Sequence, residues 1–385
     1  MLMRKATSAL VGLLLAGISA TPAQAETVRS KQWHLDAMNA AEVWKTATGK
    51  SVTVAVIDTG VAGIPELDGQ VLPGKDFLPD EKAGDERTDY QGHGTTMAAV
   101  IAGNGKGPGG ADSAFGLAPG VKILPLRVDL HGNGLSRDTT LRDAIRYAAD
   151  SDAKILNISM IGWPDSPDLS DAVKYAIGKG KLIFAGVGND GNDEAYFPAA
   201  TPGVVGVAAV DQAGSATKES QHNAAVDLSA PGVDIVTGCA GGLCNSHGTS
   251  DATALASASA ALLWSVHPDW TNNQVLRVLL NTAGKPVDGV ERNDFVGYGV
   301  VRPRVAVPTP GDPGPADVYP LPDLTAAGGA GGKTAETGSP KPAPQDPSAV
   351  EKGDGGSSLP WIALGVGACV LIGGAVTAVA VRRNR

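Results

Sequence analysis

The chain contains 385 residues and carries a formal net charge of −9. This acidic balance argues against nucleic acid as a partner, because binding to a phosphate backbone depends on clustered Lys and Arg. The two ends of the chain differ in composition from the part between them. That central part, residues 26–307, is long enough to bury one large core.

The first 25 residues have the pattern of a signal peptide. Arg4 and Lys5 precede the apolar run "ALVGLLLAGISA", and the small-residue sequence "AQA" ends at Ala25. We therefore expect cleavage after Ala25, a mature chain outside the cytoplasm, and a short N-terminal arm over residues 26–50.

Five short apolar runs rich in Val and Ile predict strands buried on both faces: 51–57, 121–128, 153–159, 181–187 and 204–210. Helical patterns that start at Ser136 and Ser166 separate some of these runs. Strands that alternate with helices predict an α/β fold with a central parallel sheet flanked by helices. In such sheets, functional sites form at the carboxyl ends of the strands.

Asp58 lies at the carboxyl end of the first predicted strand, in "VAVIDTGV". An acid in that position is costly to bury unless it is paired. Two interpretations remain open: Asp58 caps a turn through Thr59 and Gly60, or it holds a histidine.

His93 lies at the start of a predicted buried helix, in "YQGHGTTMAAVIAG", between Gly92 and Gly94. This position suits a side chain that faces a cleft. The alternative is a surface histidine in a glycine-rich loop.

Ser250 begins the alanine-rich helical pattern in "CNSHGTSDATALASASAALLW". A serine there is commonly a helix N-cap. The helix terminus also presents unpaired N–H groups and the positive end of the dipole, which suit a nucleophile whose substrate carbonyl becomes an oxyanion. The two roles can share one residue.

The chain order Asp58, His93, Ser250 is that of the subtilisin type of serine hydrolase. The three blocks around these residues resemble those of the subtilisin-like serine proteases, or subtilases. The segments "GLAPGVKILPLRV", "ILNISM", "GVGNDG" and "VDLSAPGVDI" also follow the family's order and spacing. The resemblance covers about 52–264, continues weakly to Pro303, and implies a three-layer subtilisin-like fold for residues 51–307.

This resemblance implies roles for individual residues. Ser250 would be the nucleophile, His93 the general base and Asp58 the group that orients the imidazole, while Asn189 would contribute to an oxyanion hole. A turn in "GVGNDG" is the alternative for Asn189. The residues expected to border the pocket for the substrate side chain before the cut bond are Ser159, Met160, Ile161, Ala185 and Gly186.

The sequence departs from the family pattern in a few places. Asp251 follows the serine where an apolar residue is usual; it either raises the pKa of His93 or complements the helix dipole in the first turn. Ile161 stands where glycine is frequent, and would narrow the pocket. His247 is interpreted as a loop histidine.

Cys239 and Cys244 would face the oxidising exterior, where they can form a disulfide; a free thiol pair is the alternative. We expect no metal and no cofactor. Subtilases often bind calcium, and acids cluster in residues 79–89, but the spacing of a known calcium loop is absent and a solvated loop is the favoured interpretation.

The C-terminal part has a different composition. Residues 308–358 are rich in Pro, Gly and Ala, which predicts a disordered linker. Residues 359–381 are apolar and long enough to cross a bilayer, and the arginines of the 382–385 tail favour a cytoplasmic C-terminus.

This architecture resembles the mycosins, the membrane-anchored subtilases of type VII secretion systems. The resemblance implies a single-pass cell-membrane protein whose extracellular domain hydrolyses polypeptides, with secretion-system proteins as partners and an arm that wraps the domain. The alternative is a weak or inactive subtilase fold that binds or stabilises a secretion complex.

Overall fold

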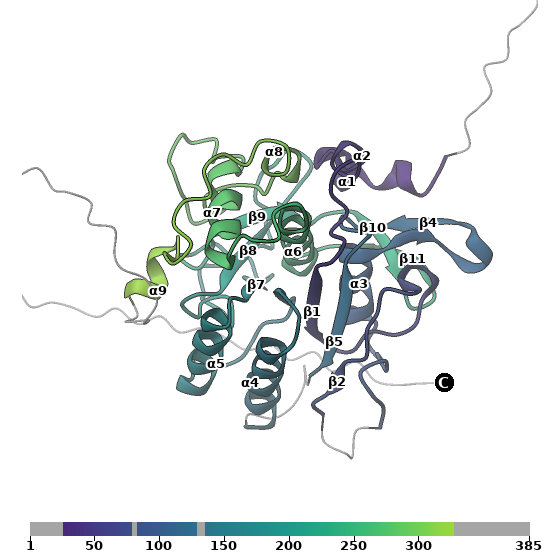
Figure 1. Cartoon of the computed structure of the whole chain (residues 1–385), viewed down its shortest axis with the longest axis horizontal. Helices are drawn as coiled ribbons and strands as arrows, with labels where there is room; N and C mark the ends of the chain where they lie inside the picture. The colour runs from purple at the N-terminus through teal and green to yellow at the C-terminus, as the bar shows by residue number, and fades with distance from the viewer. Residues whose placement is uncertain (1–25, 79–82, 129–134, 327–385) are drawn as a thin grey trace, which may run out of the picture. The chain divides into compact units, whose positions relative to one another are not determined.

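The computed structural model describes residues 26–78, 83–128 and 135–326 (Figure 1). The predicted signal peptide (1–25), membrane segment (359–381) and cytoplasmic tail (382–385) lie outside these residues. Within the described part of the chain, no helix combines the length and apolar character needed to cross a bilayer.

A seven-stranded sheet forms the centre of the fold, and all of its strand pairs are parallel. Its strands, in spatial order, are β2 (Lys75–Asp76), β5 (Lys122–Arg127), β1 (Thr53–Asp58), β6 (Ile155–Ile158), β7 (Leu182–Gly186), β8 (Val205–Val210) and β9 (Leu228–Pro231). The five predicted strands are thus confirmed. β2 and β9 were not predicted, because each is too short to stand out as an apolar run.

Helices cover both faces of the sheet, as predicted (Figure 1). One face packs against α3 (His93–Ala102), α6 (Thr249–Val266) and α7 (Asn272–Thr282). The other face packs against α4 (Leu135–Asp150) and α5 (Pro167–Gly178). Two separate apolar cores result, which is why the strands are buried on both sides and show no alternation.

Two antiparallel hairpins lie outside the sheet. One pairs β10 (Ile235–Cys239) with β11 (Gly242–Ser246), and the other pairs β3 (Asn104–Lys106) with β4 (Asp112–Phe115). A short 3-10 turn, η3 (Pro108–Gly110), joins the strands of the second hairpin.

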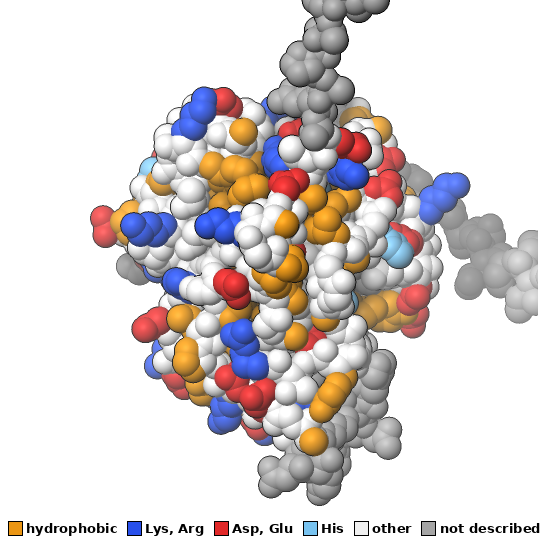
Figure 2. Space-filling view, turned by 90° about the vertical axis from the view of Figure 1, so that its right-hand side faces the viewer, with side chains coloured by type: hydrophobic (Ala, Val, Ile, Leu, Met, Phe, Trp, Pro, Cys, Tyr) orange, Lys and Arg blue, Asp and Glu red, His pale blue; other side chains and the backbone are white. Residues whose placement is uncertain are grey.

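The N-terminal arm packs against the domain through short helices: η1 (Arg29–Lys31), α1 (Trp33–Ala37) and α2 (Ala40–Val43). The amide of Gln32 donates hydrogen bonds to the carbonyls of Phe115 at 2.7 Å and Val236 at 2.9 Å. The indole of Trp33 donates to the Val233 carbonyl at 2.8 Å. The arm therefore holds both hairpins through hydrogen bonds. The face shown in Figure 2 has acidic and basic side chains interspersed among hydrophobic ones.

The described part of the chain continues beyond the predicted domain end at residue 307. Two further short elements are η2 (Pro65–Leu67) and α8 (Pro303–Ala306). The last described element is α9 (Pro322–Ala326). We call residues 308–326 the C-terminal strap. Arg277 of α7 donates hydrogen bonds to three of its carbonyls, those of Pro313, Pro315 and Val318.

Apolar side chains of the strap are also buried. Tyr319 is 8% exposed and its hydroxyl donates to the Gly203 carbonyl at 3.0 Å, while Leu321 and Leu324 join the core. The prediction of a disordered linker beginning at residue 308 is therefore wrong for the strap, because long-range partners satisfy its backbone. The rest of the predicted linker, 327–358, lies outside the described residues.

Candidate active site

Asp58 and His93 meet at the carboxyl end of β1. The Asp58 side chain is 1% exposed, and its Oδ1 lies 2.7 Å from Nδ1 of His93. The same oxygen accepts the Thr59 N–H at 2.8 Å. Both interpretations of Asp58 therefore apply, and a carboxylate in this position keeps a proton on Nδ1 and leaves Nε2 facing outward.

Backbone geometry explains how His93 reaches this position. Gly92 precedes α3 with φ of 77°, in the left-handed region that glycine tolerates. A side chain at Gly94 would come within 2.2 Å of the Gly60 carbonyl, so α3 can approach β1 only with glycine there. The glycines that flank the histidine thus set its close approach to Asp58.

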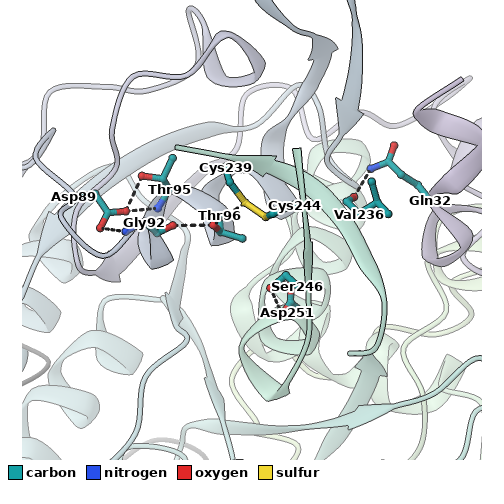
Figure 3. The surroundings of a disulfide bond; sticks show 10 residues. All are labelled: Gln32, Asp89, Gly92, Thr95, Thr96, Val236, Cys239, Cys244, Ser246 and Asp251. Carbon is teal, nitrogen blue, oxygen red and sulfur yellow. Dashed lines mark hydrogen bonds between the residues drawn. A yellow bond between two sulfur atoms is a disulfide. The ribbon is translucent and has the colours of Figure 1, made fainter. Parts of the chain in front are cut away.

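Asp89 holds the start of α3, a role that the sequence did not reveal. Its carboxylate accepts the N–H of Gly92 at 2.8 Å and both the N–H and hydroxyl of Thr95, at 2.9 and 2.6 Å (Figure 3). It also accepts the Gln91 N–H at 3.2 Å and the Thr59 hydroxyl at 2.8 Å. A search for an acid capping the helix that carries the histidine would have identified it, since it lies four residues before His93.

The charges around the imidazole raise its basicity. Burial alone would lower the pKa of His93, but the charge and hydrogen bond of Asp58 oppose it, with smaller contributions from Asp251 and Asp89, and the pKa rises to about 9. The ring is still 32% exposed, so it can meet a bound molecule. The surrounding acids therefore favour the imidazolium in the free protein.

Ser250 lies at the second position of α6, so the N-cap interpretation is wrong. The N-cap is Gly248, whose φ of 118° and ψ of 179° suit glycine alone. The Ser250 hydroxyl donates to the Ser159 carbonyl at 2.9 Å, and the Ser159 hydroxyl donates to the Ser250 carbonyl at 2.9 Å. This reciprocal pair ties the start of α6 to the end of β6.

Asn189 follows β7 and lies at the N-terminus of α6. Its Oδ1 accepts the Thr249 N–H at 2.8 Å. A Cβ at Gly248 would be 3.2 Å from the same oxygen, so the missing side chain of Gly248 makes room for the carboxamide. The structure thus brings Asn189 next to Ser250.

The predicted pocket residues divide into two groups. Ser159 contacts Ser250, Ile161 is partly exposed, and a Cβ at Gly186 would lie 3.0 Å from the Thr249 hydroxyl. Met160 and Ala185 are instead buried in the core between the sheet and α4 and α5. Their side chains therefore face the interior; in β7, Ala185 and Gly186 point to opposite faces because residues along a strand alternate in direction.

Asp251 occupies the first turn of α6 and is fully buried. Its Oδ2 accepts the hydroxyl of Ser246 at 2.8 Å (Figure 3). Burial raises the pKa of this carboxyl to about 6, while the Ser246 hydrogen bond and the charges of His93 and His247 act in the opposite direction. His247 itself is 69% exposed in its side chain, in agreement with a loop histidine.

A pocket of about 420 Å³ lies beside His93, between the start of α3 and the β10–β11 hairpin. Cys239 and Cys244 form a disulfide across this hairpin, as predicted, and both line the pocket (Figure 3). The Thr96 hydroxyl lies 3.3 Å from Sγ of Cys239. The disulfide therefore forms part of the wall opposite His93.

Among the described residues, no group of three or more His, Cys, Asp or Glu is arranged to hold a metal ion. Residues 79–82 of the acidic run lie outside the described chain, and Asp85 and Asp89 accept hydrogen bonds within their own loop.

Comparisons with known proteins identify the family of the chain. The model of the subtilase family matches residues 49–299. The chain is 35% identical over 268 residues to a thermophilic serine proteinase of Bacillus sp. (strain AK1), covering 69% of this chain and 64% of that protein. The chain thus spans just under two thirds of the length of this relative.

Solved structures with the same fold include MycP1 from Mycobacterium smegmatis, with a TM-score of 0.66 and 28% identity over 74% of this chain and 86% of that chain. The MycP3 protease from the type VII (ESX-3) secretion system gives a TM-score of 0.63 and 28% identity, over 72% and 88% of the two chains. Since the family match covers more than half of the sequence and includes Asp58, His93 and Ser250, the chain belongs to the subtilase family.

Proposed function

We propose that the chain is a serine endopeptidase in which Ser250 is the nucleophile, His93 the general base and Asp58 the carboxylate that orients the imidazole. The observation that carries this proposal is the 2.7 Å contact between Asp58 and His93 at the carboxyl edge of the sheet. A buried carboxylate on Nδ1 leaves Nε2 as the basic atom and stabilises the imidazolium that forms on proton transfer.

The steps follow from these positions. The Ser250 hydroxyl, which donates to the Ser159 carbonyl in the free protein, rotates toward Nε2 of His93. Oγ attacks the peptide carbonyl while Nε2 takes its proton, and His93 then returns that proton to the leaving amine. Water attacks the acyl-enzyme with His93 again as base, which releases the acid and restores Ser250.

Asn189 and the start of α6 would stabilise the oxyanion. The hydrogen bond from Thr249 fixes the carboxamide oxygen of Asn189, so its Nδ2 is the group available to donate to a substrate oxygen. The Ser250 N–H at the positive end of α6 would be the second donor.

A fluorophosphonate probe tests the chemistry directly, because it forms an adduct only with an activated serine. We expect labelling of the full chain, loss of labelling in Ser250→Ala, and unchanged labelling in Ser170→Ala, a control on α5. Folded wild-type protein that forms no adduct between about pH 6 and pH 10 would refute the proposal.

A membrane-anchored role in type VII secretion is the second part of the proposal. Its support is the similarity to MycP1 and MycP3, the signal-peptide pattern, and the apolar run at 359–381. The domain would lie outside the cell, the C-terminus in the cytoplasm, and the substrates would be polypeptides at the same membrane. Termini of secreted proteins should differ between cells carrying wild type and Ser250→Ala; identical termini would exclude a processing role.

A non-catalytic function in a secretion complex is the alternative. Two observations favour it: the Ser250 hydroxyl donates to Ser159, and a buried acid, Asp251, follows the serine. Such a protein would support secretion equally well with alanine at position 250 and would form no adduct with the probe.

A further inference from the structure

Asp251 is a buried carboxylate whose hydrogen bonds are only partly satisfied. The residue is 0% exposed, Oδ2 accepts the Ser246 hydroxyl, and Oδ1 has no hydrogen-bond partner. A carboxylate can accept several hydrogen bonds, and leaving one oxygen buried without a partner is costly. The dipole of α6 offsets part of this cost, because Asp251 lies in its first turn.

Asp251 lies next to the site of His93, because Ser246, whose hydroxyl bonds to Asp251, lines the same pocket as His93. The charges acting on Asp251 come from His93 at the start of α3 and from His247 in the loop before α6. Since His247 is largely exposed, solvent screens its charge. His93 is therefore the group with which Asp251 can form a favourable charge interaction inside the protein.

The imidazole is surrounded by acids from three different elements. Asp58 comes from the end of β1, Asp89 from the loop before α3, and Asp251 from α6. Asp58 already bonds to Nδ1, and Asp89 is occupied by the N–H and hydroxyl groups at the start of α3. Asp58 and Asp251 each retain one buried oxygen without a hydrogen-bond partner, Oδ2 and Oδ1 respectively, so Asp251 carries a charge beside the site that its hydrogen bonds satisfy only in part.

We propose that Asp251 is a positioning residue whose buried carboxylate, held by Ser246, stabilises the protonated form of His93 and so sets the pH range in which the site acts. This inference rests on the proposed function of His93 as general base. Asp251 does not touch the reacting atoms; it acts through the charge state of the imidazole.

The direction of the effect follows from the chemistry. A general base must be neutral to accept the serine proton, so the acid limb of the pH profile follows the pKa of His93. A negative charge that favours the imidazolium moves this limb to higher pH. The acids around the ring raise the pKa of His93 to about 9, so the free protein would be most reactive under alkaline conditions.

The substitution Asp251→Asn removes the charge and keeps an oxygen that accepts the Ser246 hydroxyl. We expect the acid limb of kcat/KM, and of labelling by the fluorophosphonate probe, to move down by about one pH unit. At pH 7 the variant should then react roughly tenfold faster than wild type. Asp234→Asn, an exposed acid of the loop before β10 whose replacement removes the same charge, should leave the limb in place.

A second variant and a direct titration keep the inference separate from the proposed function. Ser246→Ala removes the hydroxyl that favours the charged form of Asp251, so it should move the limb in the same direction by a smaller amount. The His93 imidazole can also be titrated by NMR in wild type and Asp251→Asn, whether or not the protein labels. If the His93 midpoint is the same in both folded proteins, the inference is overturned; if the midpoint moves but neither protein labels, only the proposed function fails.

Discussion

Two places in this fold show different consequences of withdrawing a carboxylate from solvent. Asp58 and Asp251 flank His93, and the pKa of the imidazole rises. At the second place Asp227, the residue before β9, accepts the Gly206 N–H at 3.0 Å, and Asp323 of the strap lines the same pocket of about 330 Å³. There, burial raises the pKa of Asp227 to about 8, and the Asp323 charge raises it further.

The difference lies in the neighbouring cations. His93 sits between the acids at the first place and can take up a proton. At the second, Arg292 lowers the pKa of Asp227 only weakly, because its guanidinium donates to the carbonyls of Ala224 and Val226 and pairs with Asp294. Acids withdrawn from solvent next to a titratable base therefore tune that base, whereas Asp227, with Asp323 beside it and only a weak opposing cation, favours its own neutral form.

The largest expected effect on activity comes from a substitution at the first place, beside His93. Asp58→Asn keeps an oxygen for the Thr59 N–H but can donate its amide to the imidazole and favour the wrong tautomer. We expect kcat on a peptide substrate to fall by about 10⁴-fold, with the fold retained, as for the same change in other Asp-His-Ser enzymes. A loss below tenfold would mean that Asp58 serves only as a turn cap.

Asn189→Ala should have the next largest effect. The expected loss in kcat is about 10²- to 10³-fold, the range established for the oxyanion-hole asparagine of subtilisin. KM should change little, since the bond to the substrate oxygen strengthens only in the transition state. The Thr249 N–H also loses its acceptor, so thermal unfolding of the variant must be measured alongside. A parallel rise in KM at unchanged kcat would contradict the oxyanion role.

Much of the fold and of this site was predictable from the sequence, for physical reasons. The five central strands are continuous apolar runs, and local sequence alone identifies such runs. The glycines around His93 and Ser250 mark close backbone approaches. The local capping signal of Asp89 at the start of α3 was missed. The reciprocal bonds between Ser159 and Ser250 were not predicted, because the two residues lie far apart in the chain.

The prediction of disorder for the strap was wrong because the partners of the strap also lie far away in the chain. Its Pro- and Gly-rich composition cannot form a core by itself, but Arg277 supplies the hydrogen bonds and Tyr319 the buried anchor. Composition describes what a segment can do alone, so it misses a segment that the domain holds in place.

Asp227→Asn tests the second place through stability. The folded-state pKa of about 8 exceeds the unfolded value near 3.8, so the folded protein binds more protons between these limits. This group therefore makes wild type progressively less stable as pH rises from about 4 to 8. Asparagine abolishes this contribution, and the Tm of the variant should decline by a few degrees less than that of wild type between about pH 5 and pH 8. Equal declines would show that Asp227 ionises normally.

The smallest expected effect concerns the strap that closes this second place. Tyr319→Phe removes only the hydrogen bond to the Gly203 carbonyl and should lower the free energy of unfolding by about 1 kcal/mol. Tyr175→Phe is the matched control, because its hydroxyl bonds to Asp150 in an exposed position and should contribute less. Denaturant unfolding at constant pH measures both variants. An unchanged midpoint for Tyr319→Phe would mean that the strap opens before the domain unfolds, so that its contacts, unlike those around His93, are not part of the cooperative core.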